Sequence, residues 1–231
     1  MSQPYWKQQN FNTLADHWRR AGKEELVLFT GAGTGHHAVD DARRPVQLPL
    51  GRQLAERLAA EVGLEYKGQP LSELAEYVLI KTKDRGHLLD LLADWLGHNK
   101  SYPDEVFKAM VLLPVHCFVT ANYDVLLEEA LRATSPSSEP PDVWDGRFAR
   151  EPRADGRSVY KVHGSLGRPD TILVTDSDFE KKFGTSGINL AVVNRVRALL
   201  SDKTLYLLVS AFATEISGIC TQRSERNSGS S

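Results

Sequence analysis

Four short, mainly apolar runs, each with glycine or polar residues at or just after its end, constrain the fold of this chain more than any other feature. They lie at residues 25–30, 116–120, 158–162 and 204–209, with segments of helical periodicity between them. Runs of this length without a polar alternation are typical of strands buried on both faces of a parallel sheet. The sequence therefore predicts an α/β fold in which a mostly parallel sheet carries helices on both faces.

A long helical block separates the first two runs. Apolar residues recur at helical spacing in successive segments, at residues 50–62, 71–81, 86–96 and 103–112. Such a block exceeds what one crossover between parallel strands requires. We predict a helical insert over about residues 50–113 that lies beside the sheet.

The rest of the chain continues this alternation and then loses it. We expect further helices at residues 125–132, 178–183 and 188–200, a loop at 133–142 and a short strand at 171–174. All these elements belong to one predicted domain, residues 1–215. Residues 216–231 are polar and rich in serine, so we expect a disordered or non-native tail there.

Composition and charge argue against several classes of protein. The formal net charge is −2 on 231 residues, with acids and bases interspersed, which predicts no direct contact with nucleic acid or an anionic membrane surface. The sequence contains no signal-peptide pattern and no apolar stretch of about 18 residues. We expect a cytoplasmic protein without a membrane partner.

The sequence also lacks metal-binding patterns. Cys117 and Cys220 lie far apart and form no C-x-x-C motif, so neither a disulfide framework nor a zinc cluster is predicted. His36 and His37 are adjacent, and adjacent side chains diverge, which disfavours joint metal binding. We therefore expect no zinc and no other bound metal.

Three of the predicted strands end in turns that carry glycine or polar residues. The turns are Gly31-Ala32-Gly33, Asn122-Tyr123-Asp124 and His163-Gly164-Ser165. Ligands of open parallel sheets bind beyond the carboxyl ends of the strands. The sequence therefore predicts that these three turns line one pocket.

Each of these turns also has a purely structural interpretation. Residues 31–33 allow close approach of a pyrophosphate, but a tight strand exit uses the same residues, and His36 breaks the G-x-G-x-x-G pattern of dehydrogenases. Asn122 and Asp124 can both bind ribose hydroxyls or hold a water, but Asn and Asp also end strands and cap helices, and Asp124 stands where a helix N-cap is expected. His163 fits either a general base or a packed histidine.

Taken together and in this order, the turns resemble the SIR2-like family of bacterial NAD-consuming effectors, which are relatives of sirtuins. The matching stretches are LVLFTGAGTG (26–35), LPLGRQLAERLAAEVGL (48–64), CFVTANYDVLLEEAL (117–131) and VYKVHGSLGRPDTILVTDSDFEKKF (159–183). The resemblance covers about residues 22–212. Its T-x-N-Y-D and K-x-H-G elements are specific when they occur with the G-A-G strand exit.

The resemblance implies a Rossmann-like domain that binds NAD. By this resemblance the residues that cradle the phosphates are Gly31, Ala32, Gly33 and Thr34, those around the nicotinamide ribose are Asn122, Asp124 and His163, and Ser210 contacts NAD from the end of the last strand. Asn122 and His163 would be catalytic. As nicotinamide leaves through an oxocarbenium-like transition state, Asn122 would position ribose and the attacking water, and His163 would accept a proton.

The acceptor decides which reaction follows. Water gives ADP-ribose, whereas an acyl-lysine gives deacylation. Sirtuin deacylases carry a four-cysteine zinc module that this chain cannot supply, so the resemblance implies NAD+ hydrolysis with release of nicotinamide. Members of the family serve in antiphage defence, where a partner protein or sensor domain triggers them, and they assemble into oligomers.

Two departures from the family pattern qualify this interpretation. The usual G-A-G-x-S turn is G-A-G-T-G here, so Gly35 replaces a serine, and residues 209–215 replace the usual G-[FY]-S-x-x-D exit. With the polar tail, the second departure predicts a shortened form of a longer effector. Two alternatives therefore stay open: a domain that senses NAD or ADP-ribose without cleaving it, and an inactive domain retained for oligomerisation.

Overall fold

The computed structural model describes residues 26–113, 115, 117–134, 141–146, 157–183, 190–202 and 204–208. Three sequence predictions therefore fall outside the described residues. They are the contact from Ser210, the replaced strand exit at 209–215 and the tail at 216–231.

The centre of the molecule is a five-stranded sheet with the order β6-β7-β5-β1-β8. Its strands are β1 (Leu26–Thr30), β5 (Cys117–Thr120), β6 (Asp142–Trp144), β7 (Ser158–Lys161) and β8 (Thr204–Leu208). Every pairing between them is parallel. The carboxyl ends of β1, β5 and β7 therefore meet at one edge of the sheet.

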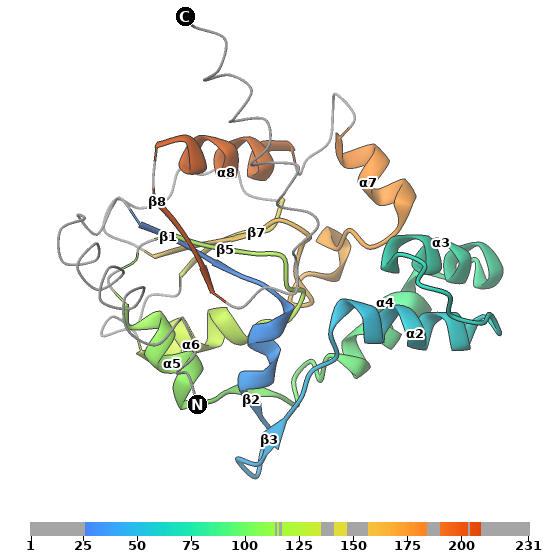
Figure 1. Ribbon diagram of the computed structural model, residues 1–231, viewed down its shortest axis with the longest axis horizontal. Helices are drawn as coiled ribbons and strands as arrows, with labels where there is room; N and C mark the ends of the chain where they lie inside the picture. The colour runs from blue at the N-terminus through green and yellow to red at the C-terminus, as the bar shows by residue number, and fades with distance from the viewer. Residues whose placement is uncertain are drawn as a thin grey trace, which may run out of the picture.

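The two faces of the sheet bury different side chains. Leu28, Phe118 and Val159 point into a core shared with the helices on one face, whereas Val27, Val119 and Tyr160 pack with α8 on the other. Helix α8 spans Leu190–Asp202, and α6 spans Leu126–Thr134. Figure 1 shows α8 on one side of the sheet and α5 and α6 on the opposite side. Successive strand residues point to opposite faces, which explains why the centres of β1 and β5 carry apolar residues without a polar alternation.

The segment between β1 and β5 is mainly helical, with α2 (Gly51–Glu61), α3 (Leu71–Thr82), α4 (Arg85–Trp95) and α5 (Glu105–Val111). Asp84 and Asp104 accept hydrogen bonds from backbone N–H groups in the first turns of α4 and α5, and so begin these helices. Helices α2, α3 and α4 lie together beside the sheet (Figure 1). The structure thus confirms the predicted α/β, Rossmann-like fold with a helical insert.

A small antiparallel sheet accompanies the insert and was not predicted. It has the order β3-β2-β4 and consists of β2 (Ala38–Val39), β3 (Pro45–Val46) and β4 (Tyr102–Pro103). Two-residue strands carry no measurable alternation of apolar and polar residues. The sequence therefore contained no signal for them.

The predicted strand at 171–174 is wrong. A short 3-10 helix at Pro169–Thr171 occupies its start, and the residues that follow are buried without strand pairing. Leu173 instead donates its backbone N–H to His163 O (3.0 Å) and accepts from the Tyr123 hydroxyl (2.8 Å). The apolar run is therefore buried as a segment that packs under the strand exits. Helix α7 (Asp176–Phe183) follows it.

The predicted loop at 133–142 contains a similar difference at its end. Residues from Asp142 onward pair with β7 as the edge strand β6, and Asp142 N–H donates to Arg157 O (3.0 Å). Proline and serine dominate the preceding residues, so the sequence pattern did not predict this short strand.

In the described part of the chain, no helix is long and apolar enough to cross a membrane.

Candidate active site

A cleft of about 580 Å³ lies at the carboxyl edge of the sheet, between the strand exits and the helical insert. Its sheet side includes Ala32, Asn122 and His163, and its insert side includes Tyr66 and Leu71. The volume falls in the range of small-molecule sites, about 300–1,000 Å³. The three predicted turns thus meet at one cavity.

Asn122 joins the end of β5 to the turn after β1. Its Nδ2 donates to Gly31 O and to Thr34 Oγ1, each at 3.1 Å, and its backbone N–H donates to Thr120 Oγ1 (3.1 Å). Two acceptors on one side of the amide fix which end carries nitrogen. Asn122 itself lines the cleft, so its anchored amide is part of the cleft wall.

The turn after β1 divides its residues between the cleft and the interior. Ala32 and Gly35 line the cleft, whereas Gly31 and Thr34 are buried. The Thr34 hydroxyl donates to Gly31 O (2.8 Å) and accepts from Asn122, so its hydrogen bonds hold the turn together. The predicted phosphate contacts from Gly31, Gly33 and Thr34 stay a prediction.

Asp124 lines the cleft and also begins α6. Its Oδ1 accepts the backbone N–H of Leu126 (3.1 Å), so the N-cap interpretation is the one that the geometry supports. Burial raises the pKa of the Asp124 carboxyl above its usual range, since a charged group is poorly solvated there. The nearby Lys161 ammonium acts in the opposite direction and limits this shift.

Lys161, the last residue of β7, connects this strand to the turn after β5. Its side chain is fully buried, and its ammonium donates to Asp124 O and to Glu128 Oε1, the latter at 2.9 Å. A buried ammonium requires such partners because it has lost its hydration. This pair fixes the distance between the strand that leads to Asn122 and the strand that leads to His163.

His163 stands at the end of β7, half-buried on the cleft wall. Its ring lies between two aromatic rings, with Tyr123 at 6.2 Å and Phe179 at 5.4 Å between ring centroids, the latter edge-on at 80°. Gly164 follows with φ +83°, and a Cβ there would lie 2.2 Å from Thr171 O. Only glycine fits that position, so the turn that presents His163 is sterically specified.

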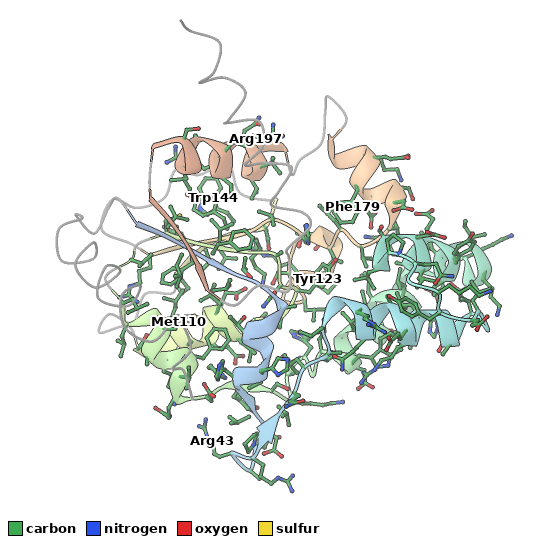
Figure 2. All side chains as sticks on the ribbon, viewed as in Figure 1. Arg43, Met110, Tyr123, Trp144, Phe179 and Arg197 are labelled. Carbon is green, nitrogen blue, oxygen red and sulfur yellow. The ribbon has the colours of Figure 1, made fainter. Side chains whose placement is uncertain are left out.

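Several cleft residues were missed by the sequence analysis. Tyr66, Leu71 and Leu54 come from the insert, and Phe179 comes from α7. Figure 2 shows Tyr123 and Phe179 at the same end of the sheet, next to the insert. No local motif marks Tyr66 or Leu71, because their position depends on how the insert folds back. The Thr175-x-x-Asp178 capping box, however, marks the start of the helix that carries Phe179.

Metal ligands do not converge in the part of the chain that the structure describes: no group of three or more His, Cys, Asp or Glu residues there can hold an ion. Of the adjacent histidines, His36 is exposed, and His37 Nδ1 lies 3.1 Å from Asp104 Oδ2. The two rings therefore have separate surroundings.

A family model matches the part of the chain that contains Asn122 and His163: the model for the SIR2-like domain matches residues 116–215. This part of the chain is therefore similar to the SIR2-like domain. Three curated bacterial relatives, each named NAD(+) hydrolase ThsA, are similar to this chain. The protein from Bacillus cereus (strain MSX-D12) is 25% identical over 170 residues, which are 73% of this chain and 34% of the relative.

The other two relatives give the same picture. The protein from Acinetobacter baumannii (strain 532279) is 27% identical over 164 residues, 68% of this chain and 31% of the relative. The one from Enterococcus faecium is 29% identical over 161 residues, 69% and 32% respectively. The chain spans about a third of the length of the curated relatives it matches.

The glycine at position 35, where the resemblance to the SIR2-like family predicted a serine, has a steric reason. A Cβ at Gly35 would lie 3.0 Å from Leu48 Cβ, so a serine there would be in close steric contact with Leu48, which precedes α2. Leu48 is itself buried and lines the cleft. In this chain Leu48 therefore occupies space beside the turn, and the hydroxyl that the turn does carry, on Thr34, bonds to Asn122.

Proposed function

We propose that this SIR2-like domain binds NAD+ in the cleft and hydrolyses it to nicotinamide and ADP-ribose. The observation that carries the proposal is the anchored amide of Asn122, which lines the same 580 Å³ cleft as His163. Chemistry at an anomeric carbon needs an oriented polar group beside a group that accepts a proton, and the two residues provide this pair.

The reaction breaks the bond between the ribose C1′ and the nicotinamide nitrogen. Its electron pair leaves with nicotinamide, which becomes neutral, while positive charge develops on the ribose. Water then forms the new C–O bond and loses one proton. In the proposal Oδ1 of Asn122 accepts a hydrogen bond from a ribose hydroxyl or from this water, and His163 takes the proton.

The shape of the cleft supports a dinucleotide more than a compact polar ligand. The insert side is largely apolar, with Arg52, Gln69 and Ser72 as its polar members, and the aromatic residues Tyr66 and Phe179 border the cavity. Planar bases gain free energy by packing against such surfaces. The polar strand exits lie on the other side, where the sugar and phosphates of NAD would be held, with Ala32 and Gly35 nearest.

The wider role follows from the relatives and stays part of the proposal. The similar bacterial proteins are named NAD(+) hydrolases, and this chain matches about a third of each. We infer that it is the NAD-consuming portion of an antiphage effector in the bacterial cytoplasm. Its activity would depend on assembly into an oligomer or on a partner of the same defence system.

The experiment is to incubate the purified protein with NAD+ and to measure nicotinamide by chromatography. Asn122→Ala and His163→Ala are expected to reduce release at least about 100-fold. Arg44→Ala is a suitable control, because Arg44 is exposed, pairs with Asp40 in the turn between β2 and β3, and does not line the cleft. NAD+ binding by calorimetry without nicotinamide release, with or without candidate activators, would contradict hydrolysis and support a sensing domain.

A further inference from the structure

A polar junction ties the helical insert to the segment that carries Phe179. Arg85, the first residue of α4, donates from Nη1 to both carboxylate oxygens of Asp178, at 3.1 and 3.0 Å. Its Nη2 donates to Ile172 O at 2.7 Å. One guanidinium thus reaches across from the insert to two points on either side of the turn before α7.

Asp178 lies in the first turn of α7 and caps the start of this helix together with Thr175. Its Oδ2 accepts the backbone N–H groups of Val174 (3.1 Å) and Thr175 (3.2 Å), while its own N–H donates to Thr175 Oγ1 (3.1 Å). This reciprocal pair is a capping box. Arg85 therefore binds the same carboxylate that sets where the helix starts and in which direction it leaves.

A second contact from the insert lies next to the first. Glu76 on α3 accepts from the Ser177 backbone N–H (3.1 Å) and hydroxyl (2.6 Å). We call these four residues, Arg85, Asp178, Glu76 and Ser177, the clasp. Two insert helices thus hold two consecutive residues of α7, which leaves that helix start little freedom to rotate.

The residue after the clasp reaches the candidate active site. Phe179 lines the cleft and contacts His163 edge-on, with 5.4 Å between ring centroids. Val174, whose N–H the clasp also binds, lines the same cleft. Any shift of the α7 start therefore moves the ring against which His163 rests.

We propose that Arg85 and Asp178 are positioning residues for the reaction: through the clasp, the insert sets the position of Phe179 and thereby of the His163 ring. This rests on the proposed hydrolysis of NAD+. The Arg85 side chain is 36% exposed, and an ion pair at that exposure contributes little to global stability. Its effect is instead local, because it fixes one wall of the cleft.

The first test compares Arg85→Ala with Arg85→Lys and with the exposed control Arg44→Ala. We expect kcat for nicotinamide release to fall about ten- to a hundredfold in Arg85→Ala, since misplacement of a reacting group by about 1 Å costs as much. The thermal midpoint should change little. Arg85→Lys, which keeps the charge but loses the two-pronged geometry, should recover part of kcat, and Arg44→Ala should match the wild type.

The second test does not need activity. The imidazole signals of His163, assigned by their loss in His163→Ala, report the ring current of Phe179 in NMR spectra. Arg85→Ala should move these signals, and in a Phe179→Leu background the same change should have no further effect on them or on kcat. Equal, additive effects in both backgrounds would overturn the proposal, as would a His163 signal and kcat that stay at wild-type values in Arg85→Ala.

The two proposals fail in different ways. A wild-type protein that releases no nicotinamide contradicts hydrolysis, yet the His163 signals still decide whether the clasp positions the ring. An active wild type whose Arg85→Ala variant is equally active contradicts the clasp alone. Should Arg85→Ala unfold, Arg85→Lys and Asp178→Asn carry the same comparison, because both retain a hydrogen-bonding side chain at the junction.

Discussion

The two walls of the cleft are built in different ways. On the sheet wall, Asn122 and Asp124 are held by hydrogen bonds to backbone groups, and Lys161 ties the strands that carry them from below. On the insert wall, Tyr66 and Leu71 are half-buried and meet the cleft with apolar surface. The polar side chains of the sheet wall are thus fixed by hydrogen bonds, whereas Tyr66 and Leu71 on the opposite wall are held mainly by packing.

This difference assigns different tasks to the walls. Bond-breaking chemistry tolerates little displacement of the groups that take part, and paired strands supply that rigidity. Binding of planar rings depends on the area and shape of the apolar surface that contacts them. Packed helices supply such a surface even when individual side chains shift slightly. Within the clasp, the hydrogen bonds from Arg85 to Asp178 connect the insert to the segment that contacts His163 on the sheet wall. The comparison predicts that sheet-wall changes affect turnover and insert-wall changes affect binding.

The largest effect should come from His163→Ala. Loss of a general base at the strand exit is expected to lower kcat about 10²- to 10⁴-fold, while the affinity for NAD+ changes only severalfold. Calorimetry for binding and a nicotinamide assay for turnover separate these quantities. Equal losses in both would make His163 a binding or packing residue, and the sheet wall would lose its special role.

The next largest effect compares one glycine on each wall. Gly164→Ala places a Cβ 2.2 Å from Thr171 O at φ +83°, so we expect a loss of about 3 kcal/mol in the free energy of unfolding. Gly68, on the insert wall, has φ +92° but no atom within 4 Å of its Cβ position, and Gly68→Ala should cost only about 1 kcal/mol. Urea unfolding measures both. Similar losses would mean that the insert wall is as tightly constrained as the sheet wall.

The same contrast explains what the sequence could predict. The strand exits are local features: an apolar run, then glycine, asparagine or histidine, with the helix of Asp124 following directly. Because parallel strands align their carboxyl ends, residues 31–35, 122–124 and 163 had to meet once the sheet was correct. The helices of the insert were predicted from their periodicity as well, near their observed bounds.

The insert wall was beyond the reach of such patterns. Tyr66 lies in a connection between helices, and Phe179 follows a helix start that the insert holds, so both depend on how distant elements pack. Residues 171–174 show the same limit, since their apolar character predicts burial but not the backbone partners that replace a strand. The periodicity of a sequence predicts which residues are buried. Which residues they pack against is seen only in the folded chain.

Tyr66→Ala should have a smaller effect than either sheet-wall change. The ring offers apolar area to a bound base, so its removal should raise KM for NAD+ about tenfold and leave kcat within about twofold. Steady-state kinetics gives both values. Tyr66→Phe, which keeps the ring, should remain near the wild type. A fall in kcat with unchanged KM would indicate that the insert wall also takes part in catalysis.

The smallest effect concerns how stability depends on pH on the two sides. Hydrogen bonds from Ser177 lower the pKa of Glu76 in the clasp, so its contribution is present at neutral pH. It is lost as the pH falls below the ordinary glutamate pKa of about 4.3 and through the lower folded-state pKa. Burial raises the pKa of Asp124, so its unfavourable contribution grows as the pH rises above about 4. Glu76→Gln should therefore cost about 0.5–1 kcal/mol at pH 7 and less in acid. Asp124→Asn, which keeps the cap, should become more favourable relative to the wild type as the pH rises. Unfolding free energies measured from about pH 2.5 to 8, a range that spans the ordinary pKa values of both carboxyl groups, would contradict the distinction between the walls if both variants shifted in the same direction.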